Sequence, residues 1–95
     1  MIIKFIGKNF YWRGPSPFYF ITVPTDQSQA IKSISSILTY GWGVIPTTGR
    51  IGNTVFQTSL FPKNGHYLVP IKNSVRDAEN LDVDDEVTVR LEFRL

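Results

Sequence analysis

The side chain in this sequence best suited to acid–base catalysis is His66, which is the only histidine. A Ser-His-Asp triad would need Ser59 or another serine beside it and a carboxylate behind it. Thr58 and Ser59 are close enough in sequence for such an arrangement, but the G-x-S-x-G pattern of a nucleophile elbow is absent. We therefore expect His66 to be a surface residue at a hairpin end, and the sequence predicts no catalytic residue.

A second group of chemically active side chains is the run of acids formed by Asp82, Asp84, Asp85 and Glu86. A calcium-binding loop needs alternating oxygen ligands, a glycine and a distal glutamate, and this run lacks that pattern. Aspartate tolerates left-handed backbone and bonds its own main chain, so the run is typical of a solvated turn. The segment 41–43, Gly-Trp-Gly, is too short for a phosphate-binding loop. We expect no metal site and no cofactor.

Aromatic side chains with polar tips occur near predicted strand ends and turns, where they could line a cleft. These aromatic residues are Trp12, Tyr19, Tyr40, Trp42 and Tyr67. Arg50, Lys72 and Arg76 could give such a cleft a positive charge that holds an anion. Alternatively, the rings plug the ends of a small barrel, and Lys72 and Arg76 pair with Asp77 or Glu79 along a helix. The sequence leaves both interpretations open.

The composition indicates a single folded domain over residues 1–95. An apolar content of 42% is enough for a core and excludes general disorder. The N-terminus alternates apolar residues with Lys4 and Lys8, as a strand does and a signal peptide does not. No apolar run approaches the roughly 18 residues of a membrane span. Because cysteine is absent too, we expect a cytoplasmic protein without membrane contact.

Charge is distributed unevenly along the chain. Residues 1–71 hold six lysines and arginines but one acid, whereas residues 72–95 hold four basic residues and seven acids. The basic residues are scattered and do not form the dense stripe that is typical of a nucleic-acid-binding protein. We therefore expect a nucleic acid partner to be absent.

Residue types along the chain predict six or seven short strands and two short helices. A strand is expected over residues 2–13, with a bend or bulge at Gly7, and a second over residues 18–23 that is apolar enough for burial on both faces. A helix follows, capped by Thr25 or Asp26 and ended by Gly41. Its apolar stripe is Ile31, Ile34, Ile37 and Leu38. Further strands are expected over residues 44–51, 54–61 and 66–69, with turns at 52–53 and 62–65.

The clearest guide to the fold is residues 69–93, where a strand end leads through a short helix and a tight turn into a long strand. Apolar residues at helical spacing are Ile71, Val75, Ala78 and Leu81. From residue 86 to residue 95 apolar and polar residues then alternate strictly, which predicts a strand with one face in the core. The inward residues are expected to be Val87, Val89, Leu91, Phe93 and Leu95.

This stretch resembles two kinds of protein: regulators of the AbrB/MazE type, and a bacterial family of domains of unknown function with a double-split β-barrel. The second resemblance covers nearly the whole chain. That family occurs alone and within proteins of the YdeI/OmpD-associated, bacteriocin-protection type. Its pattern is matched by Trp12 with Gly14-Pro15, Phe18-Tyr19-Phe20 with Pro24, Gly41-Trp42-Gly43 with Pro46, Ile51-Gly52, residues 58–62, Gly65, residues 67–72 and Val75-Arg76. The resemblance implies a small closed or double-split β-barrel of six to seven strands with two short helices. Both patterns favour glycine where this chain has Asp84, so left-handed backbone is expected there.

Three functions are compatible with these features. The first is a non-enzymatic binding or interaction domain that recognises a small molecule, a peptide or a protein, and that is a monomer or weak homodimer. The alternatives are a DNA-binding regulator of the AbrB type and, third, a small hydrolase. If the domain binds a ligand, the expected site is formed by Trp12, Trp42, Arg50, Thr58, Ser59, Lys72 and Arg76. All of these except Arg50 match the pattern of the unknown-function family.

Overall fold

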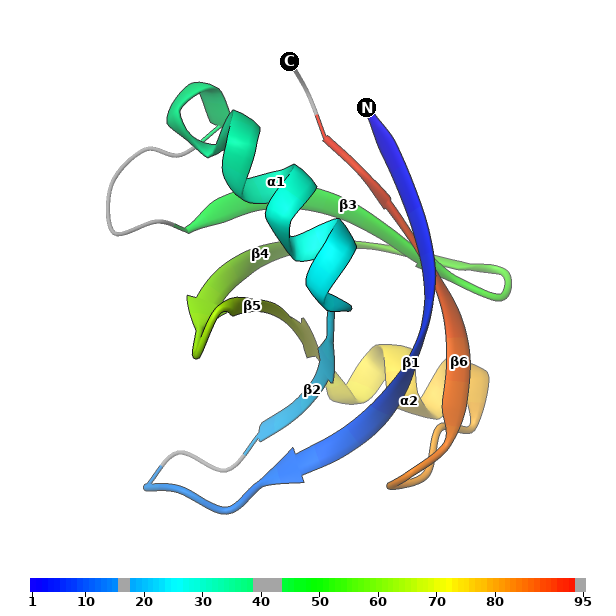
Figure 1. Cartoon of the computed structure of the whole chain (residues 1–95). Coiled ribbons are helices and arrows are strands. Elements are labelled where there is room, and N and C mark those ends of the chain that lie inside the picture. The colour runs from blue at the N-terminus through cyan, green and yellow to red at the C-terminus, as the bar shows by residue number, and fades with distance from the viewer. Residues whose placement is uncertain (16–17, 39–43, 94–95) are drawn as a thin grey trace.

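The computed structural model describes residues 1–15, 18–38 and 44–93, which form a closed β-barrel with two helices (Figure 1). The strands in this part of the chain are β1 (Ile2–Trp12), β2 (Phe18–Thr22), β3 (Ile45–Ile51), β4 (Thr54–Lys63), β5 (His66–Ile71) and β6 (Glu86–Glu92). The helices are α1 (Thr25–Leu38) and α2 (Asn73–Glu79). The predicted mainly β fold is confirmed, with six strands in the described residues.

The six strands are hydrogen-bonded in the order β1-β2-β5-β4-β3-β6, and β6 returns to β1 to close the barrel. All neighbouring pairs are antiparallel. The long strand β1 joins the two halves, because residues 2–8 pair with β6 and residues 9–12 pair with β2. One chain therefore supplies every strand of the closed barrel, and no edge strand is left open among the described residues.

Strand β6 lies where the alternating pattern predicted it, and the predicted inward residues up to Phe93 are in the core, whereas Leu95 lies outside the described residues. Val89 and Leu91 are fully buried, Phe93 is nearly so, and Val87 packs against the same cluster. Neighbouring strands fix this register, because Val89 pairs with Phe5 on one side and with Ile51 on the other. A slip by one residue would expose all of these apolar side chains, so the register is strongly specified.

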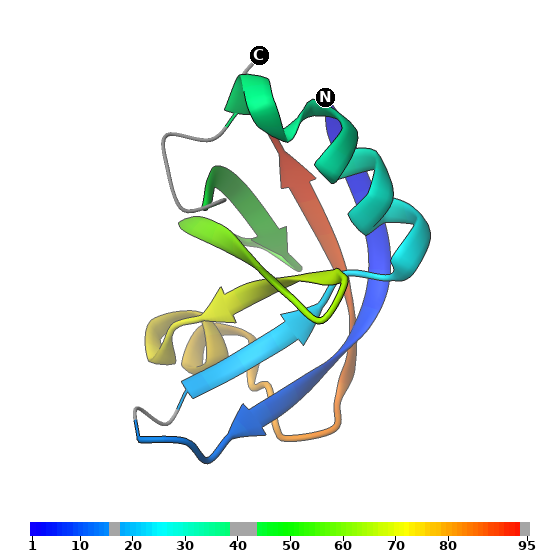
Figure 2. The same cartoon turned by 60° about the vertical axis from the view of Figure 1, so that its left-hand side comes forward.

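The two helices cover opposite ends of the barrel (Figures 1 and 2). Helix α1 contributes Ile31, which is fully buried in the core, whereas Ile34 is only half-buried; the side chains of residues 37 and 38, and Gly41, lie outside the described part. Helix α2 contributes Val75. The predicted apolar face of α2 is wrong at Ala78, which is exposed. Helix α2 has only seven residues, and Val75 is the one that it buries against the barrel.

Strand β2 is not buried on both faces as its apolar composition predicted. Ile21 is fully buried, but Phe18 on the opposite face is 38% exposed and Phe20 is half-buried. A closed barrel has one interior, so alternate residues of every strand must point outward unless a second layer covers them. The outward aromatic residues of β2 pack instead against one another on the outside of the barrel.

Two further local predictions are corrected by the pairing of the strands. Pro62 lies inside β4 opposite Tyr67, and the turn consists of Asn64 and Gly65, both with positive φ, at 52° and 81°. Gly7 lies in an unbroken ladder with β6, so it forms no bulge. A Cβ atom at Gly7 would stand 2.5 Å from the Ile21 side chain, so glycine is needed here for close packing.

The acidic turn before β6 is fastened to β1 by Asn9, a fully buried polar residue. Asn9 Nδ2 donates to the Asp82 carbonyl at 3.1 Å, the Asn9 N–H donates to the Asp85 carbonyl, and the Asn9 carbonyl accepts from the Asp84 N–H. The Asp85 carboxylate caps the turn by accepting from the Asp82 N–H at 2.8 Å. Asp84 has a φ of 71°, which confirms the expected left-handed backbone.

The conformation of Asp84 leads to a prediction with two substitutions at one position. We expect Asp84→Gly to leave the barrel at least as stable as the original chain, and Asp84→Val to lower its free energy of unfolding by about 1–2 kcal/mol. Both variants remove the same carboxylate from the acidic turn, so the difference between them reports the backbone alone. Urea unfolding of the three proteins measures it; equal midpoints for the glycine and valine variants would contradict the left-handed assignment.

Candidate functional site

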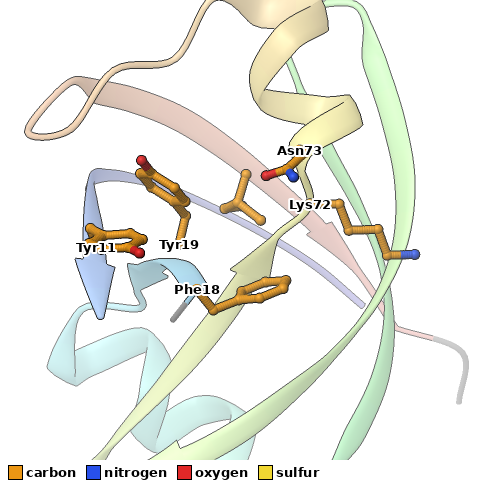
Figure 3. Close-up of a pocket in the computed structure, with 6 residues that line it drawn as sticks. Tyr11, Phe18, Tyr19, Lys72 and Asn73 are labelled. Carbon is orange, nitrogen blue, oxygen red and sulfur yellow. The ribbon is translucent and has the colours of Figure 1, made fainter. Parts of the chain in front are cut away.

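A pocket of about 460 Å³ opens at the end of the barrel that α2 covers. We call it the tyrosine pocket, and its lining residues are Tyr11, Phe18, Tyr19, Ile71, Lys72 and Asn73 (Figure 3). They come from three places: the end of β1, the beginning of β2, and the junction between β5 and α2. The volume is within the usual range for small-molecule sites, about 300–1,000 Å³.

The strand register brings the two tyrosines together. Tyr11 and Tyr19 are directly opposite each other in the β1–β2 pair, and their ring centroids are 4.8 Å apart with an interplanar angle of 50°. Tyr19 is also opposite Ile71 in the β2–β5 pair, so the residues that follow Ile71 lie next to the tyrosines. Tyr11 remains 37% exposed, which leaves much of its ring available to a ligand.

Helix α2 adds a guanidinium group behind Tyr19. The Arg76 Cζ atom lies 3.4 Å from the centre of the Tyr19 ring, and Arg76 Nη1 donates a hydrogen bond to Asn73 Oδ1 at 2.8 Å. Asn73 and Arg76 are three residues apart on one helix, so they share a face. Arg76, Tyr19 and Tyr11 therefore form one packed column in which the guanidinium fixes the orientation of Tyr19.

The positive charges at this pocket are not neutralised by the acids of α2. Among the described residues the only salt bridge joins Arg90 and Glu92, which pair with the beginning of β1, at the opposite end of that strand from Tyr11. Glu79 instead accepts a hydrogen bond from the Thr54 hydroxyl. The proposed helix pairing of Lys72 and Arg76 with Asp77 or Glu79 is thus not formed. Lys72 is exposed at the pocket rim, with its ammonium group pointing away from the tyrosines (Figure 3).

The structure brings together only part of the predicted site. Lys72 lines the tyrosine pocket and Arg76 supports it, but Trp12 lies on the outside of the barrel against Lys63. Arg50 is exposed on β3, which pairs with none of the strands that line the pocket, and its Nε donates to the Gly52 carbonyl. Trp42 lies outside the described residues.

Thr58 and Ser59 lie on opposite faces of β4 and do not line the tyrosine pocket. Thr58 lies between the core residues Phe56 and Leu60 on the inner face of β4, and its hydroxyl donates weakly to the Pro70 carbonyl, at 3.4 Å. Ser59 is half-buried on the other face. It is also remote from His66, because His66 pairs with Lys63, and Lys63 lies four positions along the strand from Ser59, about 13 Å away. The Ser59–His66 arrangement of a triad is therefore not formed.

The aromatic residues expected at a cleft have divided roles. Tyr67 is buried in the core, so it fills the barrel, whereas Tyr19 packs against the core and also lines the tyrosine pocket. Tyr40 lies outside the described residues. His66 Nδ1 is 3.2 Å from the Val23 carbonyl, at the hairpin end where a surface position was predicted, and the side chain is half-buried. In residues 1–15, 18–38 and 44–93 no group of three or more potential ligands could hold a metal ion.

Tyr11, Phe18 and Asn73 are absent from the predicted site. Phe18 matches the family pattern, but nothing in the local sequence of these three residues indicates that they line a pocket. Each of the three stands at an end of an element. The β1–β2 and β2–β5 registers bring these ends together beside the β5–α2 junction. The register of the β1–β2 hairpin could have identified Tyr11. If the aromatic residues at positions 10–12 are paired with those at positions 18–20, Tyr11 lies opposite Tyr19. That pairing would have identified the tyrosine pair.

The barrel and its pocket define a small, all-antiparallel, closed β-barrel domain with a helix at each end. Residues 5–91 match the family described as "Domain of unknown function (DUF1905)", and the chain belongs to this family. The predicted membership in an unknown-function family with a β-barrel is thereby confirmed. No curated protein matches the chain. Within the described residues, neither helix has the length and apolar character needed to cross a bilayer.

Proposed function

We propose that this domain is a non-enzymatic binding module, and that its tyrosine pocket holds a small molecule with a flat ring and a negatively charged group. The single observation that carries the proposal is the Arg76–Tyr19–Tyr11 column with its hydrogen bond to Asn73. These contacts hold the two tyrosine rings in one orientation at the pocket, beside Lys72, which forms no salt bridge with a described residue. Such preorganisation lowers the ordering cost that a ligand must overcome.

The chemistry of the lining supports this ligand class. Two tyrosine rings and Phe18 offer aromatic surface to a planar group, and Ile71 closes the base of the pocket with an apolar side chain. The polar groups are the Asn73 amide and the Lys72 ammonium, and no carboxylate lines the pocket. A ring stacked on a tyrosine would therefore place a carboxylate or phosphate substituent near Lys72, which can turn inward because it is exposed.

A DNA-binding function of the AbrB type ranks below this proposal. The helix–turn–strand stretch that resembles those regulators carries more acids than basic residues. Its four turn acids, Asp82, Asp84, Asp85 and Glu86, are all exposed. Binding to the phosphate backbone requires clustered lysines and arginines, and exposed carboxylates at the same surface oppose it. A hydrolase ranks third, since Ser59 and His66 lie apart.

Calorimetric titration with three simple probes tests the proposal. We expect phenyl phosphate and benzoate to bind and benzyl alcohol, their neutral analogue, to bind more weakly. Tyr11→Ala should weaken phenyl phosphate binding by about three- to tenfold, because an aromatic contact is worth roughly 0.5–1.5 kcal/mol. Lys72→Gln should weaken it by up to about fivefold, because an exposed charge pair is worth at most about 1 kcal/mol.

Lys4→Gln provides the matched control, since Lys4 is an exposed lysine on the part of β1 that pairs with β6. It removes the same charge at a distance from the tyrosine pocket and should leave affinity unchanged. Equal binding of charged and neutral probes, or an equal loss in Lys4→Gln and Lys72→Gln, would show that the pocket does not recognise the anion.

A further inference from the structure

A second surface of the barrel has features of a recognition site and shares only Phe18 with the lining of the tyrosine pocket. We call it the outer aromatic face, and it consists of Phe10, Trp12, Phe18, Phe20, Phe61 and Leu68. These residues alternate with core residues on β1, β2, β4 and β5, so their side chains point outward. In Figure 2, β2 (light blue) and the β4–β5 hairpin (yellow-green) lie towards the viewer.

Strand pairing assembles the face from distant parts of the chain. Phe10 is opposite Phe20, Trp12 is opposite Phe18, and Phe61 is opposite Leu68. The Phe20 ring then contacts its neighbours, with centroid distances of 5.8 Å to Phe10, 5.5 Å to Phe18 and 5.3 Å to Phe61. The result is an apolar layer outside the barrel, and contiguous patches of this kind mark interaction surfaces in soluble proteins.

Trp12 and Lys63 form a bridge across this layer. The Lys63 ammonium lies 3.1 Å from the centre of the Trp12 ring, and Trp12 itself is 39% exposed. Two shallow hollows of about 250 and 210 Å³ lie beside the bridge, and both are lined by Trp12, Lys63 and Leu68. Since a cavity of roughly 150 Å³ accommodates benzene, each hollow has room for one large apolar side chain.

The charge around the outer aromatic face is positive. The four strands β1, β2, β4 and β5 contain no aspartate or glutamate. Lys63 and His66 also line an adjoining hollow of about 620 Å³ between the β4–β5 hairpin and α1, where Lys32 adds a third basic group. An apolar surface with a rim of this kind is complementary to a partner that carries carboxylates next to apolar side chains.

We propose that the outer aromatic face binds a short acidic segment of a partner protein. Two apolar side chains of that segment enter the hollows on either side of the Trp12–Lys63 bridge. A carboxylate between or beside them binds the Lys63 ammonium, and a further carboxylate meets Lys32 or His66. The barrel is closed, so the segment adds no strand to the sheet and is recognised through its side chains.

The observations favour a peptide over single-stranded nucleic acid and over a membrane surface. Phe20 meets its neighbours in tilted or edge-on contacts, with interplanar angles of 39°, 44° and 80°, so these rings do not present parallel faces for base stacking. One face of the more exposed Trp12 ring is covered by the Lys63 ammonium. A membrane anchor requires apolar side chains that protrude into the lipid. In the outer aromatic face only Trp12 and Phe18 are exposed, and the buried Leu68 lines both hollows, so most of its apolar side chains are packed and do not protrude.

The test uses fluorescein-labelled, blocked peptides whose binding is followed by fluorescence anisotropy. The probe carries two phenylalanines in a background of aspartate and glycine. One matched peptide replaces each aspartate with lysine, and another replaces each phenylalanine with alanine. Labelled oligothymidylate and unlabelled vesicles of phosphatidylglycerol, added as competitors, represent the other two classes of partner.

We expect the acidic phenylalanine peptide to bind at least tenfold more tightly than either matched peptide. Lys63→Gln should weaken its binding by about three- to tenfold, the range expected for a charge pair at an apolar surface, and Trp12→Ala should weaken it at least as much. Lys4→Gln, which removes a lysine remote from this face, should have no effect. A dispersed amide spectrum of each variant establishes that its barrel is folded. If Trp12→Ala does not fold, the effect of Lys63→Gln on peptide affinity decides whether the proposal holds.

Several results would overturn the proposal. Equal affinity for the aspartate and lysine peptides would remove the electrostatic argument, and equal affinity for the alanine peptide would remove the role of the hollows. Tighter binding of oligothymidylate, or displacement of the peptide to vesicles, would assign the face to another class of partner. The absence of peptide binding at millimolar concentration would show that the face is not a peptide site.

Discussion

Val89→Asp is expected to prevent the chain from folding, whereas Arg90→Asp, one residue further along β6, leaves the barrel intact. Val89 is fully buried between Phe5 and Ile51 of the neighbouring strands. A carboxylate at this position would have no partner in the barrel interior, and burial of an unpaired polar or charged group costs several kcal/mol. Since small domains have roughly 5–15 kcal/mol of stability in total, that cost is sufficient to unfold this one.

Arg90 faces outward and stands between two other cations, because the strand register places it opposite Lys4 on β1 and Arg50 on β3. Its ion pair with Glu92 is long, at 3.4 Å, and largely exposed, so its loss costs little. An aspartate at position 90 would lie among basic neighbours and remove a like-charge contact. We therefore expect a change of at most about 1 kcal/mol in the free energy of unfolding.

Thermal unfolding followed by circular dichroism distinguishes the two variants. The expected result is a cooperative transition near that of the original chain for Arg90→Asp and no cooperative transition for Val89→Asp. Similar melting temperatures would mean that the two faces of β6 have been assigned the wrong way round.

Gly7→Val is the second substitution expected to have a large effect. A Cβ atom at Gly7 would meet the Ile21 side chain at 2.5 Å, the Phe5 ring at 3.2 Å and the Thr22 carbonyl at 3.3 Å. Ile21 is fully buried, so it cannot move aside without disturbing the core. Overpacking of this kind typically costs about 1–3 kcal/mol, and the branched valine adds two further carbons to the clash.

Ile6→Val is the matched control for Gly7→Val, because Ile6 is the adjacent residue and is 64% exposed. Urea unfolding should show a loss of about 1–3 kcal/mol for Gly7→Val and less than about 0.5 kcal/mol for Ile6→Val. If Gly7→Val instead matched the stability of the original chain, this result would contradict the close packing of Gly7 against Ile21.

The sequence predicts the fold well wherever one local pattern determines the outcome. The strict alternation of residues 86–93 correctly placed Val89 and Leu91 in the core, and the departure from glycine at Asp84 correctly marked a left-handed residue. The prediction is wrong for β2, because its continuous apolar run predicts burial on both faces and only one face is in the core. An apolar run of this kind is compatible with two structures. Its second face can be buried under another layer, or it can lie outside the barrel and be covered by neighbouring aromatic side chains, and the local sequence is the same in both cases.

The candidate site was less predictable, since it depends on contacts between strands. The charge of Lys72 and Arg76 and their match to the family pattern predict a site, and the structure places both residues at one pocket. Tyr11 and Asn73 were not selected, because their importance follows from the β1–β2 register and from the spacing on α2. Trp12 is near these residues in sequence, but successive residues of a strand point to opposite faces, so it belongs to the outer aromatic face.

The most direct measurement of the central claim is a two-dimensional amide spectrum of the isotopically labelled domain during titration with phenyl phosphate. Binding in the tyrosine pocket predicts saturable shifts centred on Tyr11, Phe18, Tyr19, Lys72 and Asn73. The Lys63 amide and the Trp12 indole N–H should remain unchanged, because they belong to the outer aromatic face. Shifts scattered over the surface, or centred on the acidic turn at residues 82–86, would contradict the assignment of this pocket as the binding site.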